Sequence, residues 1–375
     1  MRVLVVGPYH TSELFIKYYL QNCSCVHYST DGIQRPEHHN NQLVSLLKHC
    51  DLIVVTEPQF LTIDEFDCIN NSHIPLVCPS LPSIQLERSK IFTKELLTKL
   101  NIPTPDYTVC TTAELIKGFK DIKRPFVLKY DEHIYRKELT TIVTDDNYNQ
   151  SLKSLLLEYS KKYIKPNQKF ILEQYVDGPN EISYHAVVNN ISHQPIGSAR
   201  DYKKRYESDL GPNTDGMGSY GITQQYPIID QYLNTIVNHL KQINTPYKGF
   251  IFLGIKFDNN GVPNILEINC RPGITEIYSI LPLINNQIDS LLYDIANDNQ
   301  LPTIQFNNKK TVTVRFKTNR QPLPMTNLII TSNHNYTDNI ITAVEDTINI
   351  AADRCYQYCN SIEPYDYRTD IGYLL

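Results

Sequence analysis

The 375-residue chain is 41% hydrophobic and 20% charged, and its 35 basic and 40 acidic side chains give a formal net charge of −5. At about 100–200 residues per domain, this length predicts two to four domains or subdomains, and the apolar content excludes wholesale disorder. The charge balance lacks the basic footprint of a nucleic-acid-binding protein, and no apolar run approaches the ~20 residues of a membrane-spanning helix.

The nine cysteines are odd in number, scattered and without paired metal-ligand spacing. This usage predicts reduced thiols and a cytoplasmic location. The opening MRVLVVGPYH is too short an apolar run for a secretory signal and predicts a first strand instead.

The first 82 residues alternate strand-like and helix-like segments. Apolar runs at Arg2–Val6, Asp51–Thr56 and His73–Cys78 predict buried strands, and Thr11–Leu20 has helical spacing. Strands that alternate with helices indicate a small parallel sheet with helices on its faces. We therefore expect a parallel α/β domain over residues 1–82.

Beyond this domain, a helix is predicted over Ile84–Leu100, and Pro103 and Pro105 end it. Strands are then expected at Tyr107–Cys110, Pro125–Tyr130, Leu139–Val143, Phe170–Val176 and Glu181–Asn189, with a helix over Gln150–Lys165. A polar loop follows over Ser198–Gly218. Later elements are strands at Lys248–Phe257 and Asn264–Ile268 joined by an Asp-Asn-Asn-Gly hairpin signal, and a module over residues 303–375 with three strands and a helix at Thr347–Cys359.

Glu267 and Asn269 are two apart on a predicted strand and therefore point to one face. Leu266 and Ile268 should point the other way, into the core. A carboxylate and an amide oxygen, followed by Arg271, are suited to Mg²⁺ bound to phosphates, and the arginine can bridge to a phosphate or carboxylate. A solvated polar face on an edge strand explains the spacing equally well.

Three other segments carry candidate ligand contacts. Lys129 ends an apolar run and can point into a cleft, although a surface lysine is the commoner reading. The backbone of Leu172–Val176 can read an adenine edge, with Glu173 or Glu181 accepting from hydroxyls or an amine. The glycine-rich Gly211–Gly218 predicts a loop close to a ligand or simply a surface loop. Serine hydrolase, zincin and P-loop patterns do not occur in the sequence.

The order of these segments resembles the ATP-grasp superfamily and, within it, the phosphoribosylamine–glycine ligase family, nearly from end to end. LERSKIFTKELLTKLNIPTP resembles the family's lead-in helix, FVLK its second ATP-lysine strand and FILEQYVDGPNEIS its adenine hinge. The most specific match is Asp-Tyr-Lys followed by GPNTDGMGSY. GFIFLG and LEINCRPG resemble the family's metal strands, and YRTDIG resembles its closing motif.

The resemblance implies an ATP-grasp fold of the α/β and α+β class. It divides the chain into an N-terminal parallel α/β substrate domain (1–82), an ATP-grasp domain (83–302, with a lid subdomain at about 106–190) and a small mixed C-terminal domain (303–375). For ATP it implies contacts from Lys90, Lys129, Glu173, Tyr175, Val176 and Glu181, and for Mg²⁺ or Mn²⁺ it implies Glu267 and Asn269 as ligands. The implied catalytic residues are Arg271, Asp201 and Lys203. The implied substrate contacts are Asn213, Thr214, Asp215, Gly216, Met217, Gly7, His10 and Thr11.

The implied activity is ATP-dependent joining of a carboxylate to an amine through an acyl phosphate, with glycine and phosphoribosylamine as substrates, in purine biosynthesis. Arg271 would hold the glycine carboxylate or its acyl phosphate, and Asp201 and Asp215 would anchor the ammonium. The substrate phosphate would bind at the start of the first helix, with Thr11 or Ser12 as its N-cap. The expected partners are small molecules alone, with no nucleic acid or membrane, and the expected state is a monomer.

Three segments depart from the family pattern. The first strand is followed by Gly-Pro-Tyr-His in place of a glycine-rich phosphate loop. Asp131–Lys137 holds no glycine where the family has a flexible lid, so Arg136 or Lys137 would have to replace backbone donors. Ile274 stands at a family aspartate position, whereas Glu276 matches. These departures keep two alternatives open: a ligase of the same family with changed amine or amino-acid substrates, and a non-catalytic nucleotide-binding relative.

Overall fold

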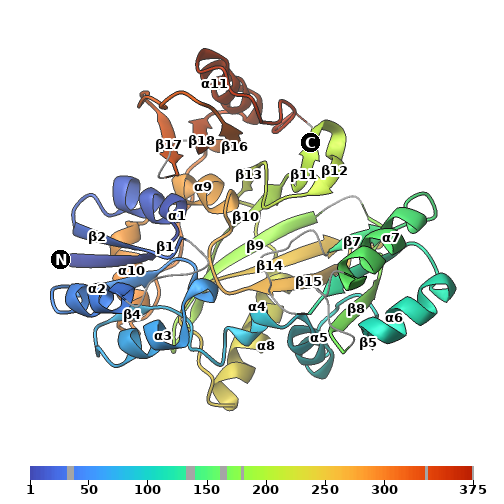
Figure 1. Ribbon diagram of the computed structural model, residues 1–375. Coiled ribbons are helices and arrows are strands. Elements are labelled where there is room, and N and C mark those ends of the chain that lie inside the picture. Colours follow the sequence, from blue (N-terminus) through green and yellow to red (C-terminus); the bar gives the residue numbers. More distant parts are fainter. Residues whose placement is uncertain (32–37, 132–139, 161–166, 179–180, 334–336, 374–375) are drawn as a thin grey trace.

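The computed structural model describes residues 1–31, 38–131, 140–160, 167–178, 181–333 and 337–373, which form four sheets (Figure 1). The N-terminal sheet is parallel, as the apolar runs predict, with strand order β2-β1-β3-β4. Its strands are β1 (Arg2–Gly7), β2 (Ser24–Ser29), β3 (Leu52–Val55) and β4 (Leu76–Val77), and its helices are α1 (Tyr9–Leu14), α2 (His38–Leu47) and α3 (Ile63–Asn70). Within the described ranges, no helix is both long and apolar enough to cross a membrane.

The first helix starts earlier than predicted. Pro8 is extended, with φ −60° and ψ 154°, and takes the N-cap position, so α1 begins at Tyr9 and a π-helical turn over Phe15–Tyr19 continues it. Thr11 and Ser12 therefore lie inside the helix and are buried. The expectation that either residue caps the helix is wrong.

The predicted helix Ile84–Leu100 is divided into α4 (Gln85–Arg88) and α5 (Lys90–Lys99). Ser89 between them is extended, and its hydroxyl accepts a hydrogen bond from the backbone N–H of Phe92 at 3.1 Å. The same hydroxyl donates to the Asp131 carboxylate at 3.0 Å. A serine with this bonding caps a new helix, which is why one periodic stretch yields two helices.

A second, antiparallel sheet has the strand order β5-β8-β6-β7. Its strands are β5 (Tyr107–Thr111), β6 (Phe126–Tyr130), β7 (Thr141–Val143) and β8 (Lys169–Gln174). Helices α6 (Thr112–Gly118) and α7 (Tyr148–Ser160) contribute Leu115 and Leu155 to its hydrophobic cluster. This sheet lies on the far side of the molecule from the N-terminal sheet (Figure 1).

The largest sheet has eight strands in the order β15-β14-β9-β10-β13-β16-β18-β17. They are β9 (Glu181–Val188), β10 (His193–Asp201), β13 (Gly218–Ile222), β14 (Gly249–Phe257), β15 (Pro263–Asn269), β16 (Lys310–Lys317), β17 (Leu328–Ser332) and β18 (Asp338–Glu345). The three C-terminal strands continue this sheet through the β13–β16 pair. Helices α8 (Pro227–Gln242), α9 (Glu276–Ile280), α10 (Ile288–Ala296) and α11 (Ile348–Ser361) complete the elements that matter here.

The segment expected as a polar loop, Ser198–Gly218, is mostly ordered in strands. It contains the end of β10 and a separate hairpin of β11 (Lys204–Tyr206) and β12 (Leu210–Asn213). The loop prediction was wrong because these strands are polar. Their sequence therefore shows no alternation of apolar and polar residues that would distinguish a strand from a loop.

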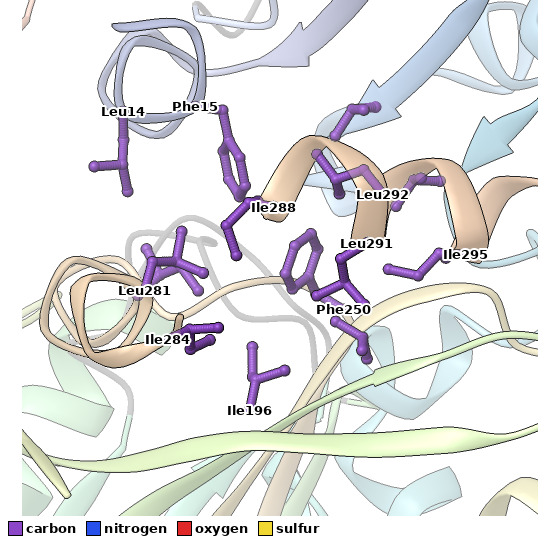
Figure 2. Packing of buried hydrophobic residues seen from close by; sticks show 14 of the residues in the cluster. Leu14, Phe15, Ile196, Phe250, Leu281, Ile284, Ile288, Leu291, Leu292 and Ile295 are labelled. Carbon is purple, nitrogen blue, oxygen red and sulfur yellow. The ribbon is translucent and has the colours of Figure 1, made fainter. Parts of the chain in front are cut away.

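A shared hydrophobic core joins the N-terminal sheet to the central sheet (Figure 2). Phe15 after α1 packs against Phe250 of β14, with ring centroids 5.6 Å apart. Leu291 of α10 and Ile196 of β10 belong to the same buried cluster. Because side chains from both sheets fill one core, the relative position of the two sheets is fixed by packing.

Candidate functional site

A cavity of about 500 Å³ is lined by residues of the antiparallel sheet, the central sheet and the two short lead-in helices. Most of the side chains singled out from the sequence line it. They are Lys90, Lys129, Glu173, Tyr175, Val176, Glu181, Asp201, Lys203, Asn213, Thr214, Asp215, Glu267, Asn269 and Arg271, with Ile274 and Glu276. Gly7, His10, Thr11, Gly216 and Met217 are not among its lining residues, and Arg136 and Lys137 lie outside the described residues.

A buried charge network occupies one wall of the cavity. The Lys129 ammonium lies 2.8 Å from the Glu173 carboxylate, and Lys94 of α5 lies 3.1 Å from the same carboxylate. Glu173 is therefore ion-paired with two lysines, whereas the sequence predicts that it accepts hydrogen bonds from an amine or from ribose hydroxyls. Burial lowers the pKa of Lys94 to about 8, even though Glu173 opposes that shift. A lysine with this pKa can lose its proton near neutral pH at little cost.

Sequence reasoning missed Lys94. It is four residues after Lys90 on one helix and therefore lies on the same helical face. Its side chain is only 1% exposed, and it also donates to the Thr104 hydroxyl at 2.6 Å. The i,i+4 spacing from Lys90 was the feature of the sequence that could have identified Lys94.

The strand that carries the metal candidates contains a β-bulge. Gly254 pairs with Glu267 and Ile255 pairs with Ile265, which leaves Leu266 without a partner on β14. The bulge turns the Leu266 carbonyl toward Lys129, which donates to it at 3.2 Å. Leu266 consequently lines the cavity. The prediction that its side chain enters the core was wrong, whereas Ile268 does belong to the core.

Glu267 and Asn269 both line the cavity and offer a carboxylate and an amide oxygen. Asn269 is 6% exposed, and its Nδ2 is buried without a hydrogen-bond partner. The unmet N–H group of this amide fits a hydrogen-bond acceptor, such as a phosphate oxygen, that would approach from the cavity, whereas its Oδ1 is the atom that could bind a metal ion. Gly254 leaves room beside Glu267, since a Cβ there would lie 3.0 Å from the Glu267 Cγ. These donors suit Mg²⁺, whose remaining positions phosphate and water would fill.

Arg271 is held by a second residue that sequence reasoning did not single out. The Arg271 Nε lies 2.9 Å from one Glu87 oxygen, and the other oxygen accepts from the Cys270 backbone N–H at 2.8 Å. Burial acts to lower the pKa of Arg271, but the carboxylates of Glu87, Glu57 and Glu276 together outweigh burial and raise this pKa. The guanidinium also lies 5.5 Å from the centre of the Phe252 ring. The sequence could have pointed to Glu87, because this residue lies in LERSK, the beginning of the segment that resembles the family's lead-in helix.

The ribose-side acid predicted from the sequence is also paired. Lys203 lies 3.0 Å from the Glu181 carboxylate. Burial acts to raise the pKa of Glu181, but the ammonium groups of Lys203 and Lys256 together outweigh burial and lower this pKa.

Gly216 matters for its backbone conformation, and Met217 matters for its packing in a hydrophobic core. Gly216 has φ +105°, and a Cβ there would lie 2.8 Å from the Asp201 carboxylate. Glycine thus allows the loop to approach Asp201 closely. Met217 is 6% exposed and packs into the core of the C-terminal strands.

The family model described as "Phosphoribosylglycinamide synthetase, ATP-grasp (A) domain" matches residues 88–277. The chain belongs to this family. The ATP-grasp fold expected from the sequence is thereby confirmed, and the cavity lies between the two sheets that the matched region contributes.

Curated relatives of this phosphoribosylglycinamide synthetase family chain include two phosphoribosylamine–glycine ligases. The one from Leptospira interrogans serogroup Icterohaemorrhagiae serovar copenhageni is 29% identical over 285 residues, which is 73% of this chain and 66% of the relative. The one from Streptomyces coelicolor is 27% identical over 281 residues, 72% of this chain and 64% of the relative. The matched region thus spans slightly under two thirds of these relatives' length.

Solved structures support the same fold. A phosphoribosylamine–glycine ligase from Thermotoga maritima has a TM-score of 0.77 at 21% identity and covers 99% of this chain and 100% of its own. An N5-carboxyaminoimidazole synthase from Aspergillus clavatus, in complex with ADP and 5-aminoimidazole ribonucleotide, has a TM-score of 0.66 at 14% identity, with 96% and 98% covered.

An acidic side chain lies at the start of α1, where the sequence predicts that the substrate phosphate binds. The Asp31 carboxylate accepts a hydrogen bond from the Tyr9 backbone N–H at 3.0 Å, at the start of α1. The Thr11 hydroxyl donates to Glu57 at 3.2 Å. Burial lowers the pKa of His10, although Asp338 opposes the shift, so a charged imidazole is disfavoured there. Gly7 serves close packing, since a Cβ there would lie 1.9 Å from the Thr56 hydroxyl oxygen.

Proposed function

We propose that the protein is an ATP-dependent carboxylate–amine ligase that joins glycine to phosphoribosylamine. One observation carries the proposal: a single cavity collects the Lys129–Glu173 pair, Glu267 with Asn269, and the Glu87-held Arg271. Family membership and the ligase names of the relatives point the same way.

In the proposed reaction, a glycine carboxylate oxygen bonds to the γ-phosphorus of ATP as the bond to the β-phosphate oxygen breaks, releasing ADP. The amine nitrogen of phosphoribosylamine then attacks the acyl carbon, phosphate leaves, and the nitrogen loses a proton. The protein contributes positioning and charge, because neither step needs a covalent enzyme intermediate.

Different residues of the cavity would bind the different parts of ATP and of the two substrates. Lys90 and Lys129 would neutralise phosphate oxygens, and the backbone at Tyr175 and Val176 would bind the adenine edge, with Glu181 near the ribose. Arg271 would orient the glycine carboxylate, because Glu87 fixes the direction of its guanidinium. Asp201 and Asp215 would bind the ammonium, with Lys203, Asn213 and Thr214 beside them.

Glu267 and Asn269 would hold Mg²⁺ or Mn²⁺ with the nucleotide phosphates. The ion would supply charge neutralisation of the triphosphate during phosphoryl transfer. The described residues contain no group of three or more His, Cys, Asp or Glu side chains suited to a metal ion. Binding would accordingly depend on the nucleotide, with ATP and the ion entering together.

We further propose that residues 1–82, 83–302 and 303–375 act as substrate, ATP-grasp and C-terminal domains of a monomer. All nine cysteines are free, which suits a reducing cytoplasm. The substrates in this proposal are small molecules: ATP, glycine and a phosphorylated amine.

Phosphate release from Mg·ATP tests the proposal. Release that requires glycine and phosphoribosylamine together supports it, and release with other amines supports the alternative of changed substrates. Two observations favour that alternative: the Asp31 carboxylate at the start of α1, and Ile274 in the cavity wall. Absence of release across a panel of amino acids and amines would contradict both and leave a nucleotide-binding relative.

A further inference from the structure

Lys94, Lys129 and Glu173 form a buried group of two cations and one acid. The Lys129 ammonium donates to Oε1 of Glu173 at 2.9 Å. Oε2 of the same carboxylate lies 2.8 Å from the Lys129 ammonium and 3.1 Å from the Lys94 ammonium. The side chains of Lys94 and Glu173 are each 1% exposed, and that of Lys129 is 7% exposed. With both lysines protonated, two positive charges share one negative charge, and the group has a surplus positive charge.

Stability does not account for the second lysine. One ammonium group is enough to neutralise the Glu173 carboxylate, and a second one adds the cost of removing a charge from water. Burial accordingly lowers the pKa of Lys94 to about 8, even though Glu173 opposes this shift. Replacement of buried charges by apolar side chains is often neutral or stabilising. The surplus positive charge therefore indicates a role in binding an anion.

Of the two lysines, Lys129 faces the cavity. Lys129 and Glu173 are lining residues, whereas Lys94 is not among the described residues that line the cavity. The Lys94 ammonium is also fixed by a hydrogen bond to the Thr104 hydroxyl at 2.6 Å. This hydroxyl in turn donates to the Ile265 carbonyl at 2.8 Å. Because Lys94 is held behind the cavity wall, its effect on a ligand would pass through the carboxylate that it shares.

The two lysines compete for this carboxylate. In a buried site, an ion pair with a single partner is strong, because water does not screen it. Without Lys94, Glu173 would pair with Lys129 alone and neutralise the charge that faces the cavity. With Lys94 present, part of the Glu173 charge is directed toward Lys94, and the Lys129 ammonium keeps a net attraction for an anion in the cavity.

We propose that Lys94 is a positioning residue for nucleotide binding: it shares the Glu173 carboxylate and so leaves the charge of Lys129 available to the phosphate groups of ATP. The inference rests on the proposed function for the identity of the ligand, but nucleotide binding can be measured without turnover. It makes the affinity for ATP depend on a side chain that does not line the cavity.

The test is calorimetric titration of the full chain at pH 7 with Mg²⁺ and a non-hydrolysable ATP analogue. Lys94→Met removes the second cation and keeps an unbranched side chain. The double variant Lys94→Met/Glu173→Gln also removes the acid, so that the group has the same net charge as in the wild type. Lys309→Met is the matched control, because Lys309 is paired with the exposed Asp346 and lies outside the cavity. Thermal unfolding of each variant reports on the fold.

We expect Lys94→Met to bind the analogue about tenfold more weakly than the wild type, within the usual range of coupling between residues of one charge network. The added Glu173→Gln substitution should restore the affinity, because the carboxylate that pairs with Lys129 is then gone. Lys309→Met should match the wild type. In turnover, the KM for ATP should rise in Lys94→Met while the KM for glycine does not.

Unchanged affinity in Lys94→Met would overturn the inference, as would failure of the wild type to bind the analogue. A loss that Glu173→Gln does not restore would overturn it too, because Lys94 would then act through the fold or through direct contact with the nucleotide. The two proposals fail separately. A Lys94-dependent nucleotide site in a protein that does not join glycine to phosphoribosylamine contradicts the ligase reaction alone. A working ligase whose affinity for ATP is indifferent to Lys94 contradicts this inference alone.

Discussion

At the scale of single residues, burial of the Lys94 ammonium makes the folding stability depend on pH. The pKa of Lys94 is lowered from 10.5 to about 8 in the folded chain, chiefly by burial. Below pH 8 its proton is bound in both states, and charge burial lowers stability. Between pH 8 and 10.5 the unfolded chain binds more protons than the folded chain, so the free energy of unfolding gains on the order of 3 kcal/mol as pH rises.

Lys94→Met should remove this gain. We expect the difference in unfolding free energy between the variant and the wild type to favour the variant most at pH 7–8 and to shrink toward pH 10.5. Urea titrations at each pH measure it, and the comparison cancels the titration of other lysines and tyrosines. A difference that is constant with pH would contradict the buried, easily deprotonated Lys94.

Glu87 positions Arg271, and its carboxylate should matter for turnover more than for nucleotide binding. In Glu87→Gln the charge that fixes the guanidinium is lost while the shape is kept. We expect kcat to fall by about 10- to 100-fold, the loss of one charge-assisted contact, with unchanged ATP affinity. Phosphate release and nucleotide titration measure the two quantities. Glu363→Gln, which removes an exposed partner of Arg320, is the control and should behave as the wild type.

Glu267 should be required for turnover but not for folding. Its side chain faces the cavity and lies outside the hydrophobic clusters, so Glu267→Ala should unfold at the wild-type temperature. Loss of an ion ligand leaves the triphosphate charge poorly neutralised, and we expect turnover to fall by about 100-fold or more. Phosphate release over a range of Mg²⁺ concentrations tests this. Wild-type activity in the variant would rule out the metal assignment.

At the scale of elements, the C-terminal motif holds the β11–β12 hairpin against the cavity. Arg368 is fully buried and lies 2.8 Å from Asp209 and 2.6 Å from Asp370. It also donates to the Lys204 carbonyl at 3.0 Å. Since Lys204 and Asp209 line the cavity, the chain's end helps to shape it.

Arg368→Ala should loosen this hairpin. Removing the guanidinium leaves two carboxylates without their shared cation, and we expect amides over residues 204–213 to exchange about tenfold faster or more, while amides of β14 keep their protection. Hydrogen exchange read by mass spectrometry measures both regions. Arg320→Ala, an exposed arginine, serves as the control. Equal protection in Arg368→Ala and the wild type would show that strand pairing alone holds the hairpin.

The sequence predicts elements that bury alternating or continuous apolar residues, such as β1, β3, β14 and β15. It does not predict features set by single hydrogen bonds. The helix break at Ser89 depends on Asp131, and the bulge at Leu266 depends on register with β14. In the same way, Lys129 and Arg271 stood out by motif, whereas the ion pairs of Lys94 with Glu173 and of Glu87 with Arg271 are recognised only once the fold brings the charges together.

At the scale of the whole molecule, one core joins the N-terminal sheet to the central sheet, while the antiparallel sheet has a cluster of its own. Phe250 of β14 is 4% exposed and contacts Phe15 across this junction. Truncation of a buried phenylalanine creates a cavity in a densely packed interior. The two sheets should therefore lose stability together when Phe250 is truncated.

Phe250→Ala should lower the free energy of unfolding by about 3–5 kcal/mol, the usual cost for a buried phenylalanine. Amides of β1 and of β14 should both lose protection, because they share the damaged core. Phe119→Ala is the matched control: Phe119 is 1% exposed, but it lies in the separate cluster of the antiparallel sheet. Its truncation should loosen β6 and β8 and leave β1 protected. If Phe250→Ala affected β14 alone, the N-terminal sheet would be an independent folding unit, and the substrate and nucleotide parts of the protein would be coupled only through ligands.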